Sequence, residues 1–501
     1  MKPYSFSCPG IRRAVLTSAL GFAISLAAVP ASAQTGFYRQ LSQDSFTDPA
    51  AQHMTEVEPG AFAYRSTVVT AFQVARISSG GGDDIGFATT LNGGTTWTNG
   101  YLPGLTTYGG GGTNSAASDP SVAYDVKHGV WLINTLPIAG GVNVAVSRST
   151  DGIHWGNPIY ITQAGDADKN WINCDNTATS PYYGNCYVGW DNSQIQMTTS
   201  SDGGVTWGPA KATAAGDFGI GVNPVVQPNG TVVVGFADFS GGMSAFTSSN
   251  GGQSWNAAVR ISTAPSHGEA GGLRSAGLPS TAIDGAGKIY VSWPDCRFRS
   301  GCASNDIVYS TSTDGTHWSS VVRVPIDPVT STVDHFIHGM GIDIRTSGSS
   351  AHMGITYYYY PVSACGSSCR LYVGFTLSND GGQTWTAGRQ LSGPMQLSWL
   401  PNTFSGRMVA DYVATVYPLG TTVVARALPI FAMAFTPTGS LFQQAIYTEA
   451  FGFSVDEMTE QRMSSKDDLP IPGAKSDHPA RRPEDRDNEL PAQPSNTPPA
   501  E

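Results

Sequence analysis

Apolar and polar residues alternate in short stretches along most of the chain, which is typical of β-strands. Few residues separate these stretches, and Gly, Asn and Ser are frequent there, as expected of tight turns. Two regions each contain four consecutive stretches, at 221–227, 231–238, 243–249 and 257–262, and at 278–284, 288–294, 305–312 and 321–325. No convincing amphipathic helix follows residue 33. The pattern predicts repeated units of four antiparallel strands, buried between adjacent sheets.

A short turn motif recurs between the third and fourth predicted strands. Its six copies are TLNGGTTW (90–97), STDGIHW (149–155), SSDGGVTW (200–207), SSNGGQSW (248–255), STDGTHW (312–318) and SNDGGQTW (378–385). The Asp or Asn is expected to accept hydrogen bonds within its own turn, the glycines to supply positive φ, and the Trp to pack on a neighbouring strand. A turn that recurs at a spacing of 48 to 67 residues marks a repeat architecture. We therefore interpret these Asp residues as structural rather than catalytic.

The motif resembles the Asp-box, or BNR repeat, of the sialidase-like β-propellers. The resemblance covers roughly residues 55–450. The copies at Asp151 and Asp314 are one residue shorter, and Asn92 and Asn250 stand where the family motif has Asp. The resemblance implies an all-β fold, a β-propeller of four-stranded antiparallel blades.

The ends of the chain bear on the number of blades. After Trp385, the segments 407–416, 421–428 and 431–437 are expected to form the first three strands of a blade without a turn motif. The segment 37–42 is expected to supply its fourth strand. Closing the ring with N- and C-terminal strands would remove the exposed sheet edges. We therefore favour seven blades over the six of true sialidases.

The chain divides into three parts. Residues 1–33 resemble a signal peptide, because Arg12 and Arg13 precede an apolar run that ends near a small-residue cleavage site at 31–33. Either general secretion or twin-arginine export fits this segment. The propeller is expected over 34–453, and the tail 454–501, rich in proline and charge, is expected to be disordered. The mature protein should be secreted or periplasmic, with no membrane span.

Cysteine usage agrees with export. Outside the leader, six cysteines form three close pairs in the sequence: Cys174 and Cys186, Cys296 and Cys302, and Cys365 and Cys369. We interpret them as disulfides rather than zinc ligands, because no histidines accompany them in a ligand pattern. The net charge of −11 argues against nucleic acid as a partner. We expect a monomer without a metal or cofactor.

In a propeller, the loops opposite the turn motifs carry the site. The resemblance implies three arginines that bind the substrate carboxylate, a tyrosine nucleophile assisted by a carboxylate, and an aspartate acid. Loop position assigns these roles to Arg274, Arg297 and Arg407, to Tyr412 with Glu269, and to Asp295. The tyrosines at 357–360 are alternative nucleophiles.

Each assignment has a structural alternative. Asp295 and Arg297 fit a loop salt bridge, the tyrosine run fits packing, and Tyr412 fits closure of the last blade. The family's first Arg motif, with Ile-Pro after the arginine, is matched at neither Arg39 nor Arg65.

Two functions follow. The first is an exported sialidase-like glycoside hydrolase that acts on carbohydrate or a glycoconjugate. The second is a non-catalytic propeller that binds glycan or protein at the cell surface.

Overall fold

The computed structural model describes residues 38–162, 165–192, 194–419, 426–450, 452–454, 458 and 462–464. All of them belong to one compact unit, 37–501. The predicted signal peptide and most of the predicted tail lie outside the described residues. Within the described ranges the elements are strands and short 3-10 helices, and none of the helices is long and apolar enough to cross a membrane.

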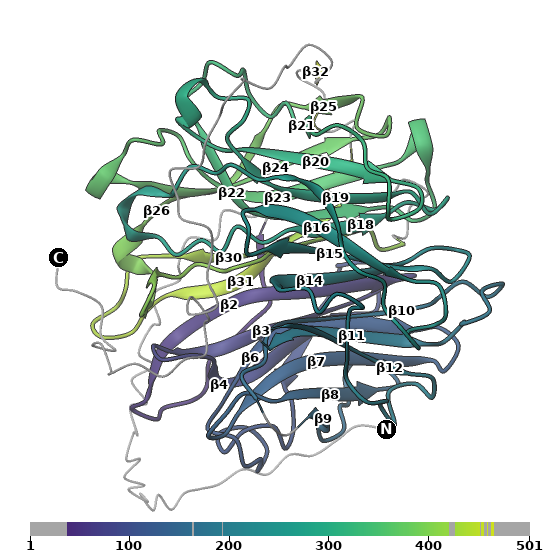
Figure 1. Ribbon diagram of the computed structural model, residues 1–501. Coiled ribbons are helices and arrows are strands. Elements are labelled where there is room, and N and C mark those ends of the chain that lie inside the picture. The colour runs from purple at the N-terminus through teal and green to yellow at the C-terminus, as the bar shows by residue number, and fades with distance from the viewer. Residues whose placement is uncertain are drawn as a thin grey trace, which may run out of the picture. The chain divides into compact units, whose positions relative to one another are not determined.

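Four sheets consist of four antiparallel strands each, in chain order (Figure 1). They are β10 (Asp168–Cys174), β11 (Cys186–Asn192), β12 (Gln194–Ser200) and β13 (Lys211–Ala212); β14 (Gly219–Val226), β15 (Val232–Asp238), β16 (Gly242–Ser248) and β17 (Val259–Thr263); β18 (Ser280–Ile283), β19 (Ile289–Asp295), β20 (Asp306–Ser312) and β21 (Val322–Arg323); and β22 (Asp334–Ile342), β23 (Met353–Tyr360), β24 (Arg370–Ser378) and β26 (Arg389–Gln396).

A larger sheet of twelve strands contains three more runs of four. They are β2 (Ala51–Tyr64), β3 (Thr67–Ile77), β4 (Gly82–Thr90) and β5 (Thr98–Tyr101); β6 (Ala116–Asp125), β7 (Val130–Ile138), β8 (Val144–Ser149) and β9 (Ile159–Thr162); and β29 (Ala414–Val416), β30 (Leu428–Ala434), β31 (Gln444–Glu449) and β1 (Tyr38–Gln40). Single residue pairs, Thr55 with Gln444 and Gly82 with Ala117, join the runs.

The remaining elements are short. Two small sheets pair β25 (Thr384–Thr386) with β32 (Arg462–Ser464) and β27 (Asn402–Thr403) with β28 (Gly406–Arg407). The 3-10 helices are η1 (Ala270–Gly272), η2 (Ser300–Cys302), η3 (Gly348–Ser350), η4 (Gly366–Ser368) and η5 (Leu397–Trp399). β32, which pairs with β25, lies within the segment that the sequence predicts to be disordered.

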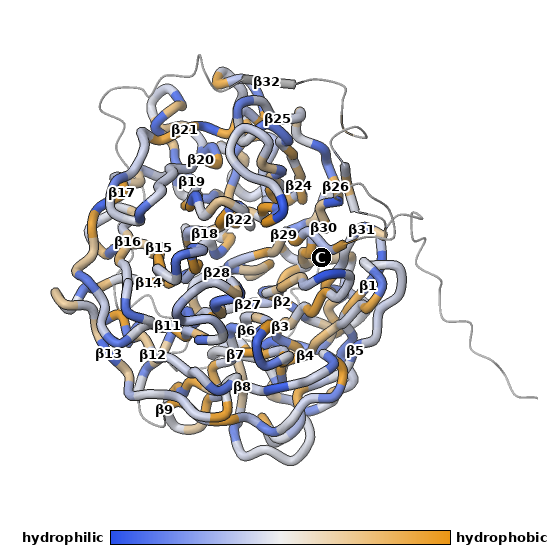
Figure 2. Tube along the Cα trace, turned by 90° about the vertical axis from the view of Figure 1, so that its right-hand side faces the viewer, coloured by the Kyte–Doolittle hydropathy of each residue, from blue (hydrophilic) through white to orange (hydrophobic). Residues whose placement is uncertain are grey.

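The first strands of the runs contact one another in order. β2 contacts β6, and contacts continue through β10, β14, β18, β22 and β29, which in turn contacts β2. In Figure 2, β2, β6, β18, β22 and β29 lie toward the middle, and the fourth strands of the runs lie toward the periphery. β22 is buried throughout, because side chains on both of its faces pack on other strands, whereas β18 is fully buried at only two of its four residues.

The structure agrees with the strand order expected at 221–262 and 278–325, and it changes the expected order near the C-terminus. The N-terminal segment pairs with the last strands as expected, since β1 is antiparallel to β31. However, 431–437, expected to be a third strand, lies mostly in β30, the second strand of its run. The third strand is β31, which was not identified from the sequence. Residues 420–425 lie outside the described ranges.

All six turn motifs connect the third and fourth strands of a run, as expected. In each, a Ser or Thr hydroxyl donates to the Asp or Asn side chain, for example Ser200 Oγ to Asp202 Oδ1 at 2.8 Å. The same oxygen accepts a backbone N–H later in the turn, as from Thr206. The carboxylates are therefore committed to the turn. The tryptophans differ in burial: Trp385 is 0 % exposed, whereas Trp207 is only partly buried.

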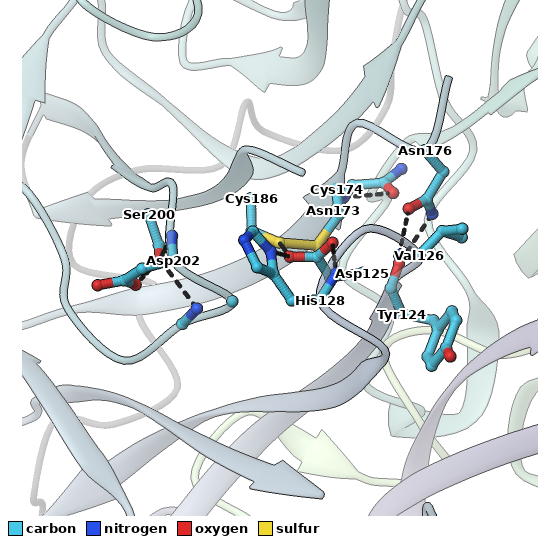
Figure 3. The surroundings of a disulfide bond; sticks show 12 residues. Tyr124, Asp125, Val126, His128, Asn173, Cys174, Asn176, Cys186, Ser200 and Asp202 are labelled. Atoms are coloured by element: carbon cyan, nitrogen blue, oxygen red, sulfur yellow. Dashed lines mark hydrogen bonds and ion pairs between the residues drawn. A yellow bond between two sulfur atoms is a disulfide. The ribbon is translucent and has the colours of Figure 1, made fainter. Parts of the chain in front are cut away.

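The three expected disulfides are formed. Cys174–Cys186 joins the facing ends of β10 and β11, and the other two lie in loops between second and third strands. Figure 3 shows the first disulfide beside Asp125, whose Oδ2 lies 3.7 Å from Cys186 Sγ and 2.6 Å from His128 Nδ1. The turn of Ser200 and Asp202 lies nearby in the same view.

Candidate functional site

The first strands of five runs contain a bulge with unusual backbone geometry. At Glu58, Asp119, Lys169, Gly221 and Ile337, φ is 56°, 46°, 45°, 71° and 41°. The pairing register with the second strand shifts at each of these positions. A bulge re-aims its side chain, and positive φ at a residue other than Gly is strained. Three of the five bulges carry a charged residue.

Lys169 lies among three carboxylates from different runs of strands. Its Nζ is 3.3 Å from Glu58 Oε1, 3.1 Å from Asp119 Oδ2 and 2.8 Å from Asp411 Oδ2. The lysine side chain is 2 % exposed, and none of the three acidic side chains exceeds 1 %. The bulges thus bring opposite charges together in the interior, where they attract strongly.

A second cation completes this group, which we call the charged cluster: Glu58, Asp119, Lys169, Arg274 and Asp411. Arg274 contacts Asp411 with two bonds, Nε to Oδ1 at 3.0 Å and Nη2 to Oδ2 at 2.5 Å. The cluster has one more negative than positive group when fully ionised. Buried ion pairs of this kind offset the cost of desolvation only when their geometry is good and further hydrogen bonds are present.

Such hydrogen bonds are present. Gln73 Nε2 donates to Glu58 Oε2 and to Ser118 Oγ, and the Ser118 hydroxyl donates to Asp119 Oδ1 at 2.5 Å. These contacts fix two carboxylates from β2 and β6 in place.

Burial and the excess negative charge perturb the ionisable groups. Burial raises the pKa of Glu58 well above its usual range, the nearby Lys169 opposes this, and Asp119 adds to it. Burial also raises the pKa of Tyr412, and the carboxylates of Glu58 and Asp119 add to that effect. The charge of Glu58 therefore affects the protonation of Tyr412, whose hydroxyl donates to the Pro120 carbonyl.

A cavity of about 220 Å³ adjoins the cluster. The first strands of the runs line it, with mostly apolar side chains. Its ionisable lining groups are Lys169, Tyr412, Tyr417 and His338. Tyr412 packs against Trp171 with ring centroids 5.2 Å apart and donates from Oη to the Pro120 carbonyl at 3.3 Å. The cluster therefore meets the cavity through Lys169 and Tyr412.

The three arginines predicted to bind a carboxylate have different partners. Arg274 binds Asp411, and its backbone N–H donates to the Arg407 carbonyl at 2.8 Å. The Arg407 side chain donates to the Leu400 carbonyl at 2.8 Å. Arg297 binds Asp295, Ser262 and the Thr263 carbonyl. Among the described residues, no contact joins Arg297 to the other two arginines.

The predicted catalytic residues are also dispersed. Asp295 is buried and accepts from Arg297 Nη2 and from Trp293 Nε1, at 2.7 and 2.8 Å. Burial raises its pKa, although the hydrogen bonds from Arg297 oppose this. Glu269 precedes η1 and raises the pKa of Tyr360, after the larger effect of burial. The carboxylates that act on Tyr412 are instead Glu58, Asp119 and Asp411.

The sequence interpretation missed Glu58 and Asp119. Both precede a proline within a first strand, as Glu58-Pro59-Gly60 and Asp119-Pro120-Ser121. A charged residue before proline in an otherwise apolar strand is the signal that could have identified these bulges, because proline is tolerated at bulges within sheets.

No family model matches the chain, and no curated protein matches it. Among solved structures, the Hadza microbial sialidase Hz136 is 18% identical with a TM-score of 0.40, over 61% of this chain and 64% of that chain. The intramolecular trans-sialidase from Ruminococcus gnavus is 13% identical with a TM-score of 0.39, over 82% and 97%. A polysaccharide lyase, PL25 ulvan lyase, is 9% identical with a TM-score of 0.45, over 82% and 98%. Similarities of this size do not assign a family.

Proposed function

We propose that the protein is an exported β-propeller of seven blades that hydrolyses glycosidic bonds in a sialidase-like manner. The six turn motifs support the family resemblance, because each forms the same internal hydrogen bonds at the same point of its run. The cyclic order of contacts among β2, β6, β10, β14, β18, β22 and β29 supports seven blades. The three disulfides support an oxidising destination, secreted or periplasmic.

The observation that carries the catalytic part is the position of Tyr412. Tyr412 lines the cavity. The charges of Glu58, Asp119 and Asp411 add to the effect of burial in raising the pKa of its phenol. A tyrosine assisted by a carboxylate is the nucleophile of sialidases. In the proposal, Tyr412 Oη attacks the anomeric carbon while Glu58 accepts the phenol proton; the glycosidic bond breaks, and the candidate acid Asp295 protonates the departing oxygen. Water then hydrolyses the bond between Tyr412 and the sugar. Glu58 therefore takes the role that the sequence interpretation gave to Glu269.

The remaining roles stay as proposed from the sequence. Arg274 and Arg407 are candidate substrate-binding residues, since their backbones are hydrogen-bonded to each other. Arg297 and Asp295 are a candidate binding residue and a candidate acid, and their mutual ion pair would have to open for either role. The substrate would be a carbohydrate or glycoconjugate, and we expect a monomer.

The test is release of 4-methylumbelliferone from a panel of glycosides that includes a sialoside. Tyr412→Phe removes one hydroxyl and should lower kcat/KM by about 100-fold or more, as expected for a group that takes part in bond cleavage. Tyr417→Phe is the matched control. Tyr417 lines the same cavity, but its hydroxyl has no hydrogen-bond partner among the described residues. Equal activities of the two variants would contradict the role of Tyr412.

One observation favours the second function, a non-catalytic glycan- or protein-binding propeller. Lys169 and Arg274 both form ion pairs with buried carboxylates of the cluster, so their positive charges are largely balanced before any substrate binds. Binding of a glycan without turnover of any glycoside in the panel would support that function over hydrolysis.

A further inference from the structure

Asp48, His53 and Asp83 form a compact group outside the charged cluster. Asp48 precedes β2, His53 lies in β2 and Asp83 lies in β4. One donor atom from each residue lies within 4.8 Å of the other two. Two carboxylates and an imidazole at such separations can share one cation.

Three of the four carboxylate oxygens of Asp48 and Asp83 lack a hydrogen-bond partner among the described residues, and the fourth, Asp48 Oδ1, accepts the Ala50 N–H at 2.9 Å. Asp83 is 0 % exposed, and neither of its carboxylate oxygens takes part in a hydrogen bond among the described residues. The Oδ2 atom of Asp48 is also buried without one. No lysine or arginine of the described chain forms an ion pair with either residue. Burying such groups unpaired is costly, and a bound cation would remove the cost.

The imidazole of His53 lies between the Asp44 carboxylate and the Asp48 backbone carbonyl. Its Nδ1 lies 3.1 Å from Asp44 Oδ2, and Asp44 also accepts the backbone N–H groups of Phe46 and Met54 at 2.9 and 2.7 Å. A carboxylate held in this way favours the tautomer with hydrogen on Nδ1. Nε2 lies 2.5 Å from the Asp48 carbonyl oxygen, which can only accept, so either a proton on Nε2 or a cation must lie between these two atoms. A histidine that binds a metal through one ring nitrogen commonly donates a hydrogen bond from the other nitrogen to a carboxylate.

A second group of the same composition provides a comparison. Asp306, Asp327 and His335 are equally close to one another. There, Arg299 contacts both carboxylates, at 2.5 and 2.6 Å, and Arg323 contacts both at 2.9 Å. The arginines supply the positive charge in that group, whereas no such residue does so around Asp48 and Asp83.

We propose that Asp48, His53 and Asp83 bind one divalent metal ion, with the Asp48 carbonyl oxygen as a further ligand. The mixed nitrogen and oxygen donors favour Zn²⁺ or Mn²⁺ over Ca²⁺, which takes six to eight oxygen ligands. His53 is 16 % exposed at its side chain, which leaves room for water to complete the coordination. The ion would tie the segment around Asp44 and Asp48 to β2 and β4.

The competing explanation is a proton shared by the two carboxyl groups. Burial, together with the neighbouring Asp48, raises the pKa of Asp83 to about 10 in the absence of a cation. Both explanations relieve the same repulsion, but only one depends on metal.

The experiment uses the untagged mature protein, depleted of metal and titrated separately with Zn²⁺, Mn²⁺ and Ca²⁺ by calorimetry. We expect one Zn²⁺ or Mn²⁺ ion per chain and a higher melting temperature in its presence. Asp83→Asn and His53→Gln should each weaken binding by about 10- to 100-fold or more. Asp327→Asn, in the arginine-paired group, is the matched control and should bind metal like the parent.

Asp83→Asn also separates metal binding from a folding defect. Because it removes a buried negative charge, the variant should melt no lower than the parent in metal-free buffer, and lower than the parent in saturating metal. Absence of uptake by the parent, or uptake unaffected by Asp83→Asn, would overturn the proposal in favour of the shared proton. Uptake of Ca²⁺ alone would overturn the choice of metal.

Discussion

His338 should make the protein sensitive to mild acid. It lies in β22, lines the cavity and is 4 % exposed. Its Nε2 lies 2.7 Å from Ser292 Oγ, and its Nδ1 has no hydrogen-bond partner among the described residues. Burial lowers its pKa from 6.5 to about 4, and the hydrogen bond with Ser292 opposes this effect only in part. The folded protein therefore holds this imidazole neutral where the unfolded chain would protonate it.

The sign and size of the effect follow from proton binding. Between the folded and unfolded pKa values, the unfolded state binds more protons, so stability rises with pH and is lost as pH falls. With pKa values of 6.5 unfolded and about 4 folded, lowering the pH from about 7.5 to about 5 should cost about 2 kcal/mol. Above about pH 7.5 both states are neutral, and the contribution vanishes.

The assay is urea unfolding of the parent and of His338→Gln at both pH values. Other groups titrate in the same range; burial raises the pKa of Asp334 to about 6, for example, which gives a change of opposite sign. The comparison between parent and variant cancels these contributions. His338→Gln should lose about 2 kcal/mol less than the parent between the two pH values. Identical losses would refute the argument that His338 is buried in its neutral form.

Two further predictions concern the core and the charged cluster. Trp385→Ala should lower the free energy of unfolding by about 3–5 kcal/mol, because Trp385 is 0 % exposed. Trp207→Ala should lower it by less. Equal losses in urea melts would contradict the argument from burial. Lys169→Met leaves three buried carboxylates facing Arg274 alone and should cost about 3–5 kcal/mol. The ammonium of the partly exposed Lys211 donates to the Gln253 carbonyl, and Lys211→Met should change stability by less than about 0.5 kcal/mol. A similar loss in both lysine variants would contradict the importance of the cluster.

Features with short-range causes could be predicted from the sequence. Each turn motif is held by hydrogen bonds between residues at most four positions apart, such as Ser200 with Asp202 and Asp202 with Thr206. The disulfides join cysteines separated by 12, 6 and 4 residues. Local pattern determines such contacts, because few competing partners lie within reach. Strand assignment was less successful near the C-terminus, where long apolar segments do not by themselves distinguish a second strand from a third.

The charged cluster depends on contacts that no local pattern specifies. Glu58, Asp119 and Lys169 lie in the first strands of three successive runs, while Asp411 and Arg274 approach from segments far along the chain. Taken alone, each would be interpreted as an ordinary charged residue. Bulges turn Glu58, Asp119 and Lys169 toward one another, and a bulge arises from pairing with the next strand rather than from the residue itself. Because each buried charge needs partners from other runs, the cost of leaving it unpaired opposes any arrangement in which those runs are displaced. The same contacts that place Lys169 and Tyr412 at the cavity therefore also favour one relative position of the strands that line it.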